Sequence, residues 1–154
     1  FQINKKFSKK VKGRFTYANL VYNQEIIEGK PGVPNVYANI GIADVTYKFT
    51  TRKSLRTETQ ILFTDQDQGD WATLLLEYSY SPHWFIAIMD QYNYGNKDSE
   101  KQVHYYNVSA GYNNKGNRIS MSYGRQRAGI FCVGGVCRVV PASNGLYLSV
   151  TSSF

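Results

Sequence analysis

The sequence has no long run of apolar residues and little that favours helix. Only 19% of its 154 residues are charged, and Ala, Leu, Glu and Lys do not recur at helical spacing. No segment approaches the roughly 20 apolar residues of a transmembrane helix, and none has the h-region of a secretory signal. These absences exclude a helical bundle and a helical membrane protein. They do not exclude membrane-crossing strands, which are apolar on only one face and have no long apolar run.

Motifs of catalysis and cofactor binding are also missing. The chain has two histidines and two cysteines, and it contains no phosphate-binding glycine loop, nucleophile elbow or HExxH motif. We therefore expect no cofactor, no metal and no catalytic residue. The alternative is a membrane-embedded enzyme with its site at a barrel rim, whose first candidates are Asp65, Asp67, Asp70 and His104.

The composition favours a β-rich fold. Aromatic residues make up 15% of the chain, with 13 tyrosines and 13 glycines, and aromatic side chains are common in strands. The length suits one domain over residues 1–154, or the C-terminal segment of a larger one. Alternation and turn residues predict eight strands, at about 11–26, 36–49, 55–65, 71–81, 84–95, 102–113, 118–128 and 144–154.

The connections between these strands alternate in length. Short connections at 50–54, 81–83 and 114–117 alternate with longer ones around 29–32, 65–70, 96–101 and 129–143. Short periplasmic turns and longer extracellular loops are typical of outer-membrane β-barrels. The sequence therefore predicts an antiparallel up-and-down transmembrane β-barrel, with about eight strands in this chain.

Alternation assigns two faces to several strands. The predicted lipid-facing residues are Thr59, Ile61, Phe63, Leu74, Leu76, Tyr78, Tyr80, His104, Tyr106, Val108, Ala110, Tyr112, Ile119, Met121 and Tyr123. The predicted inward residues are Arg56, Glu58, Gln60, Thr73, Leu75, Glu77, Ser79, Asn107, Ser109, Gly111, Ser120, Ser122 and Gly124. Aromatic residues near the strand ends are typical of membrane-interface girdles.

Charged side chains of inward parity form a predicted cluster in the barrel lumen. Its members are Asp44, Lys48, Arg56, Glu58 and Glu77. The lumen of an eight-stranded barrel is filled by side chains, so buried charges must pair there. We expect a salt-bridged plug. A catalytic pair made by Glu58 and Glu77 is the alternative.

The chain is basic, with a formal net charge of +7. Many of the cations lie in or near the predicted short turns, as in the segment KKFSKKVKGR at 5–14. This segment lacks the interleaved aromatic residues of single-stranded nucleic-acid binders. We expect contacts with anionic lipid headgroups or a periplasmic partner, and no nucleic acid.

Cys132 and Cys137 flank a Gly-Gly pair that lets the chain reverse. An oxidising envelope permits a disulfide across this short loop, and we expect one. Zinc would need further ligands, and the two histidines lie on other connections. The apolar residues of the same loop indicate that it packs against a neighbouring protein or against the barrel mouth.

The terminal segment NGLYLSVTSSF, at 144–154, has the pattern of a closing barrel strand. Leu146, Leu148, Val150 and Phe154 share one parity, and this pattern resembles the C-terminal signal read by the barrel-assembly machinery. Ser152 departs from it, because an aromatic residue often stands at that place. An ordinary amphipathic strand that ends on Phe is the alternative.

The run SYGRQRAGIFCVGGVCRVVP at 122–141, with Gly145 and the terminal strand, resembles the C-terminal end of an uncharacterised family of Bacteroidota outer-membrane proteins. The resemblance implies a bacterial outer-membrane location and a longer barrel of which these residues are the end. It carries no catalytic residue. Arg125, Arg127 and Arg138, together with Phe131 in the same loop, are candidates for contact with lipopolysaccharide phosphates or a partner. Solvation of the rim by the arginines is the alternative.

The sequence thus predicts an integral outer-membrane β-barrel, non-enzymatic, acting as a structural or accessory subunit of an envelope complex for transport, secretion or outer-membrane protein assembly. Its expected partners are membrane lipid and lipopolysaccharide, the barrel-assembly machinery and other outer-membrane proteins. A porin-like diffusion pore is the first alternative, if the chain is part of a larger barrel with a wet lumen. A soluble lipocalin-like ligand-binding barrel is the second.

Overall fold

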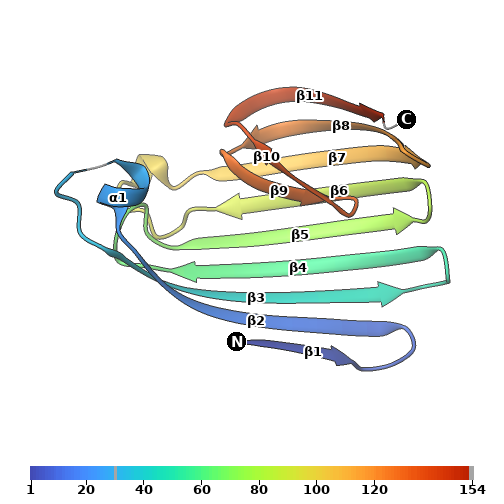
Figure 1. The fold of residues 1–154 in the computed structure, drawn as a ribbon, viewed down its shortest axis with the longest axis horizontal. Helices are drawn as coiled ribbons and strands as arrows, with labels where there is room; N and C mark the ends of the chain where they lie inside the picture. The colour runs from blue at the N-terminus through green and yellow to red at the C-terminus, as the bar shows by residue number, and fades with distance from the viewer. Residues whose placement is uncertain (30, 153–154) are drawn as a thin grey trace.

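The protein, in a computed structural model that describes residues 1–29 and 31–152, is built mainly from one antiparallel sheet (Figure 1). Nine strands form this sheet, in the order β1-β2-β3-β4-β5-β6-β7-β8-β11. Their bounds are β1 Gln2–Lys6, β2 Val11–Tyr22, β3 Val36–Lys48, β4 Lys53–Phe63, β5 Trp71–Tyr80, β6 Trp84–Tyr92, β7 His104–Asn114, β8 Asn117–Gln126 and β11 Ser143–Ser152. The remaining elements are the strands β9 Gly129–Val133 and β10 Val136–Val140, the helix α1 Gln24–Glu28 and the 3₁₀ turn η1 Ser99–Lys101.

The eight strands predicted from alternation are confirmed as β2 to β8 and β11, with ends that shift by a few residues. The first is shorter than predicted, because Asn23 begins α1: its Oδ1 accepts a hydrogen bond from the Ile26 N–H at 2.9 Å. Strand β1 was not predicted. It pairs with β2 through residues that include Lys5 and Lys6, in a lysine-rich stretch with little of the expected strand character.

Each strand of the sheet pairs with its neighbour in the sequence, except that β8 pairs with β11. Figure 1 shows the short turns of β1–β2, β3–β4, β5–β6 and β7–β8 at one end of the sheet, and α1, η1 and the longer connections at the other. The predicted alternation of short and long connections is therefore present. An up-and-down antiparallel all-β architecture is confirmed. Among the described residues no pairing joins β1 to β11, so these two strands are the edges of the sheet.

The register divides the sheet into two faces. One row of cross-strand neighbours runs through Asp44, Glu58, Leu75, Met89 and Asn107 and defines what we call the inner face. The row beside it runs through Val45, Thr57, Leu76, Ile88 and Val108 and defines the outer face. The residues predicted to face lipid all lie on the outer face, and those predicted to face inward all lie on the inner face.

The outer face is apolar and exposed, whereas the inner face is more polar and better buried. Ile88 is 53% exposed, while its chain neighbour Ala87 is 1% exposed. Buried polar residues of the inner face include Asp44, Glu77 and Ser109. A protein that folds in water buries its large apolar side chains and exposes polar ones, so this sheet has the opposite arrangement.

Strands β9 and β10 form a two-stranded hairpin that lies across the inner face (Figure 1). Its apolar side chains join those of the sheet in the one hydrophobic cluster of the described residues: Leu75, Phe85, Ala87, Phe131, Val133 and Val140, with Met89 at its edge. Gly111 on β7 leaves room for the Phe85 ring of this cluster, because a Cβ there would overlap Phe85 Cε1. The loop predicted at 129–143 is thus largely a hairpin packed on the sheet.

Neither α1 nor any other helix within residues 1–29 and 31–152 is long and apolar enough to cross a membrane.

Candidate functional site

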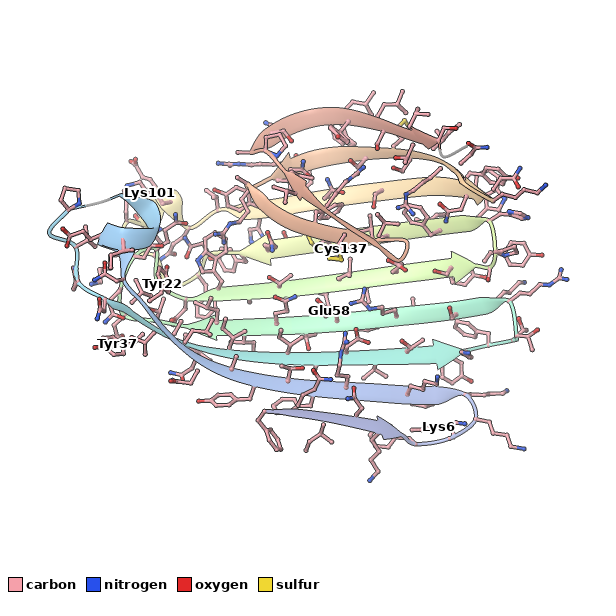
Figure 2. All side chains as sticks on the ribbon, viewed as in Figure 1. Lys6, Tyr22, Tyr37, Glu58, Lys101 and Cys137 are labelled. Carbon is pink, nitrogen blue, oxygen red and sulfur yellow. A yellow bond between two sulfur atoms is a disulfide. The ribbon has the colours of Figure 1, made fainter. Side chains whose placement is uncertain are left out.

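A charged cluster lies on the inner face of β2, β3 and β4. Arg56 donates from Nε to Asp44 Oδ2 at 2.8 Å and from Nη2 to Glu58 Oε2. Figure 2 shows Glu58 on β4, on the same side of the sheet as the hairpin. The predicted pairing of Asp44, Arg56 and Glu58 is therefore present, and each of these charges has a partner, as a half-buried ion cluster requires.

The cluster differs in two members from the prediction. Arg14 on β2 donates from Nη2 to Asp44 Oδ2 at 3.2 Å and belongs to it, although the uncertain facing of the first strand concealed this. Lys48 has the inward parity but is exposed near the β3–β4 turn, and it makes no ion pair among the described residues. Its position at the end of β3 keeps its ammonium in water.

Glu77, the fifth predicted member, is 7% exposed and holds the tip of the hairpin. Its Oε2 accepts a hydrogen bond from the Gly134 N–H at 2.8 Å. Its Oε1 lies 3.4 Å from the Ser79 hydroxyl, which donates to it. A carboxylate that accepts from backbone N–H makes a charge-assisted hydrogen bond, so Glu77 anchors the hairpin and does not pair with Glu58 as a catalytic couple.

Arg118 on β8 binds the same tip from the other side. Its Nη1 donates to the Gly134 carbonyl at 3.0 Å, and its Nη2 donates to the Val133 carbonyl at 2.9 Å. The guanidinium also lies over the Phe85 ring, 4.5 Å from its centroid. Glu77 and Arg118 together bind the peptide groups at the tip. They lie 57 and 16 positions from Gly134, and no sequence motif predicted these contacts.

Gly134 and Gly135 form the two-residue turn of the hairpin. Both have positive φ, 58° and 75°, as a type I′ turn requires at its two central residues. A Cβ on Gly134 would lie 2.6 Å from Phe85 Cδ1, whereas a Cβ on Gly135 would meet nothing within 4 Å. The two-residue Gly-Gly between apolar alternations was the signal that could have predicted the hairpin.

Cys132 and Cys137 form the predicted disulfide, and they are directly paired across β9 and β10. Figure 2 shows the sulfur atoms beside Cys137 over the sheet. The pair and Val139, which is 81% exposed, have the parity opposite to Phe131 and Val133. The hairpin therefore packs one side on the sheet and leaves the disulfide side uncovered.

The predicted contact residues of this region have partners within the chain. Phe131 is 4% exposed in the core cluster, so its assignment as a partner contact is corrected: the loop packs on the sheet because its apolar side chains bury there. The guanidinium of Arg127 lies 4.1 Å from the Trp71 ring centroid, that of Arg125 lies 5.0 Å from Tyr105, and that of Arg138 lies 5.0 Å from Tyr147.

The terminal strand presents its apolar residues outward. Leu146, Leu148 and Val150 are each more than 60% exposed on the outer face of β11. Phe154, the last residue of the predicted assembly signal, lies outside the described residues.

Aromatic rings gather at both ends of the strands. At the short-turn end, Tyr47 and Phe49 have centroids 4.9 Å apart, and Trp84 and Tyr112 have centroids 4.7 Å apart. At the other end, Tyr92 stacks on His104 with centroids 4.1 Å apart. The described part of the sheet therefore carries an aromatic belt at each end of its outer face.

Two residues weighed as catalytic candidates, Asp70 and His104, hydrogen-bond to different neighbours. His104 Nδ1 lies 2.7 Å from Asp90 Oδ2 on the outer face, and Asp70 Oδ1 accepts from the Thr64 N–H at 2.8 Å in its own loop. His83 is at the opposite end of the sheet, with Nδ1 2.7 Å from the Asn113 carbonyl. No group of three or more His, Cys, Asp or Glu in residues 1–29 and 31–152 is placed to hold a metal.

An open groove of about 580 Å³ lies on the inner face beside the charged cluster. Its lining combines four cationic side chains of the inner face with one carboxylate: Lys6, Lys12, Arg14, Arg56 and Asp44. Asn4, Lys5, Gly13 and Thr46 complete it. The hairpin packs on residues of β5 and β6, whereas this groove is lined by residues of β1 to β4.

The comparisons with known proteins give a family without an assigned activity. No curated protein and no solved structure matches the chain. The model of one family, described as a family of unknown function (DUF6029), matches residues 1–154. The chain therefore belongs to the DUF6029 family.

Proposed function

We propose that this chain forms the wall of an outer-membrane β-barrel and acts as a non-enzymatic structural or accessory subunit of an envelope complex. The observation that carries the proposal is the inverted sheet. Ile86, Ile88 and Met121 are more than half exposed on the outer face, while the inner face holds the ion cluster of Asp44, Arg56 and Glu58. Water gives no reason for this arrangement, because exposed apolar surface costs roughly 25 cal/mol per Å²; lipid acyl chains remove that cost.

The dimensions of the sheet agree with this proposal. Strand β4 has 11 residues and β3 has 13. At about 3.3 Å per residue and a tilt near 40°, 11 residues cover about 28 Å along the membrane normal, close to the apolar band of such barrels. The aromatic belts lie at the two ends of the strands, where amphipathic rings contact lipid headgroups.

The open edges support completion of the sheet by further strands. The edge strand β11 has 10 residues and β1 has 5, and exposed strand edges cannot be tolerated in a bilayer because their N–H and C=O groups would be unsatisfied. We propose that additional strands join these edges and close the barrel. The docked hairpin then lies in its lumen and narrows it, which favours an accessory subunit over an open channel.

Membrane fractionation tests the location directly. We expect the native protein in the outer-membrane fraction, resistant to extraction by high salt and alkaline carbonate and released by detergent. A folded protein that stays soluble without detergent would contradict the proposal and would favour the lipocalin-like alternative. Stoichiometric companions on a native gel are the expected sign of an accessory subunit.

A diffusion pore is the second candidate, and the free groove beside the charged cluster favours it. In a closed barrel this groove would face the lumen next to the hairpin. Planar-bilayer recordings separate the two functions: an accessory subunit with a closed lumen passes no ions, whereas a pore gives stepwise conductance. Conductance without companion proteins would place the pore ahead.

A further inference from the structure

Two lysines face each other directly on the inner face, at the free end of the groove. Lys6 on β1 is the register partner of Lys12 on β2, and the same row continues through Thr46 to Arg56. Figure 2 labels Lys6 on β1, near the β1–β2 turn. Like charges directly opposite on one face of a sheet are destabilising, so the fold itself gives no reason for this pair.

The neighbouring row supplies further donors. Asn4 is the register partner of Arg14, and Arg14 is the partner of Asp44. Directly opposite side chains have Cβ atoms about 4.5–5.5 Å apart, so Asn4, Lys6 and Lys12 surround one small volume of the groove. An amide, two ammonium groups, a guanidinium and the Thr46 hydroxyl can therefore reach a single bound group.

No free carboxylate competes for these donors in the described part of the chain. Asp44 already accepts from Arg14 and Arg56, and Glu58 accepts from Arg56 and the Gln60 amide. Lys6 and Lys12 make no ion pair among the described residues. The groove therefore has an excess of positive charge and of hydrogen-bond donors.

We propose that this groove binds a free phosphate-class oxyanion. A phosphate oxygen set accepts charge-assisted hydrogen bonds from ammonium and guanidinium groups together, and a doubly charged anion removes the repulsion between Lys6 and Lys12. The groove opens on the inner face, opposite the apolar outer face, so its ligand is a dissolved solute and not a lipid headgroup. The choice of a solute over a headgroup rests on the proposed function, in which lipid covers the outer face; the donors themselves lie on the inner face.

Titration calorimetry of the full chain in non-ionic detergent, with inorganic phosphate at low ionic strength, tests the proposal. We expect saturable binding that weakens at least about tenfold in the double variant Lys6→Gln, Lys12→Gln, because the anion loses two charged hydrogen-bond donors. The charge-conserving variant Lys6→Arg, Lys12→Arg should bind within about threefold of the native chain. Because this variant keeps both charges, it tests whether substitution at these two positions by itself abolishes binding.

The matched control removes the same net charge elsewhere. Lys53 lies at the start of β4 over the Tyr80 ring, and Lys97 is exposed in the connection before η1. The variant Lys53→Gln, Lys97→Gln should leave phosphate affinity within about twofold. Equal weakening in both double variants would overturn the site, because the effect would then be one of overall charge.

Lipid vesicles separate the two sources of phosphate. The native chain is reconstituted with phosphatidylcholine vesicles, with or without phosphatidylglycerol. Its co-flotation is compared with that of the Lys6→Gln, Lys12→Gln variant and of the Lys53→Gln, Lys97→Gln control. We expect no change in co-flotation in the Lys6→Gln, Lys12→Gln variant. If that variant loses binding to anionic vesicles while inorganic phosphate gives no saturable heat, the lysines recognise headgroups and the proposal is wrong.

Discussion

The Gly134 N–H donates a hydrogen bond to the carboxylate of Glu77 at 2.8 Å, across 57 positions of the sequence. This contact fixes the tip of the β9–β10 hairpin to the middle of the sheet. Because Glu77 is 7% exposed, its buried carboxylate needs the hydrogen bonds that the Gly134 N–H and the Ser79 hydroxyl donate.

Removing that acceptor should release the hairpin. We expect the Glu77→Ala variant to weaken docking of the hairpin on the sheet by about 2 kcal/mol, the scale of one hydrogen bond to a charged group. Amide hydrogen exchange in residues 131–140 measures this as faster exchange. Thr57→Ala, on the outer face of β4, is the control and should leave those amides unchanged.

The two glycines of the turn offer a matched pair. Both Gly134→Ala and Gly135→Ala put a side chain at positive φ, which costs about 1–2 kcal/mol. Only the first also drives a Cβ into Phe85, at 2.6 Å, and into Arg118 Nη2, at 2.9 Å. We expect Gly134→Ala to be more destabilising by a further 1–3 kcal/mol, roughly the cost of overpacking, in denaturant unfolding monitored at the hairpin. Equal effects of the two variants would show that a Cβ on Gly134 does not clash with Phe85.

Loss of the disulfide should destabilise the chain without releasing the hairpin. Cys132 and Cys137 close a loop with a sequence separation of 5, for which the chain-entropy relation gives about 2 kcal/mol. The double variant Cys132→Ser, Cys137→Ser should unfold at lower denaturant but keep the hairpin docked, since Glu77 and Arg118 still hold its tip. Hydrogen exchange of the Gly134 amide under native conditions distinguishes this from release of the whole hairpin.

Adjacent residues on β11 test what covers the outer face. Leu148 is 63% exposed on the outer face, and its neighbour Ser149 lies on the inner face, paired with Ser120. In a bilayer an outward arginine near the midplane costs about 2–4 kcal/mol, so Leu148→Arg should sharply reduce the yield of membrane-inserted, detergent-extractable protein. Ser149→Arg should change that yield much less. In water both changes would fall within about 0.5 kcal/mol of neutral, and equal yields would contradict a lipid-facing surface.

The ion cluster gives a further expectation. Arg56→Met leaves Asp44 and Glu58 without their shared cation. We expect a loss of roughly 2 kcal/mol in unfolding free energy, below the 3–5 kcal/mol of fully buried pairs because the Arg56 side chain is 27% exposed. Lys48→Met removes a cation of the same face that has no such pair, and its unfolding midpoint should stay near that of the native chain.

Alternation was enough to predict most of the sheet, because a one-residue shift would move a whole side of each strand to the wrong face. Leu76 and Glu77 thus took opposite faces from sequence alone. Alternation failed where the face is mixed: Asn19 made β2 ambiguous and hid Arg14, which faces Asp44. It also failed for β1, since lysine-rich edge strands carry little apolar signal.

The candidate site was predicted only in part for a different reason. The disulfide follows from two cysteines on either side of Gly-Gly, a local pattern. The contacts of Arg118 and Glu77 with the hairpin tip join segments that are distant in sequence, and no local periodicity encodes them. The groove at Lys6 and Lys12 required β1 to be recognised as a strand, because only its register places the two ammonium groups opposite one another.

The hairpin leaves the sheet after Gln126 and the chain returns at Ser143, and these two residues are direct neighbours across β8 and β11. The segment between them takes no place in the nine-stranded sheet, so a tight turn could replace it without changing the register of β8 and β11. Sheet and hairpin can thus vary independently: substitution, shortening or exchange of the hairpin would alter what covers the inner face while the outer face stays the same. Diversity among related chains should concentrate in this detachable segment.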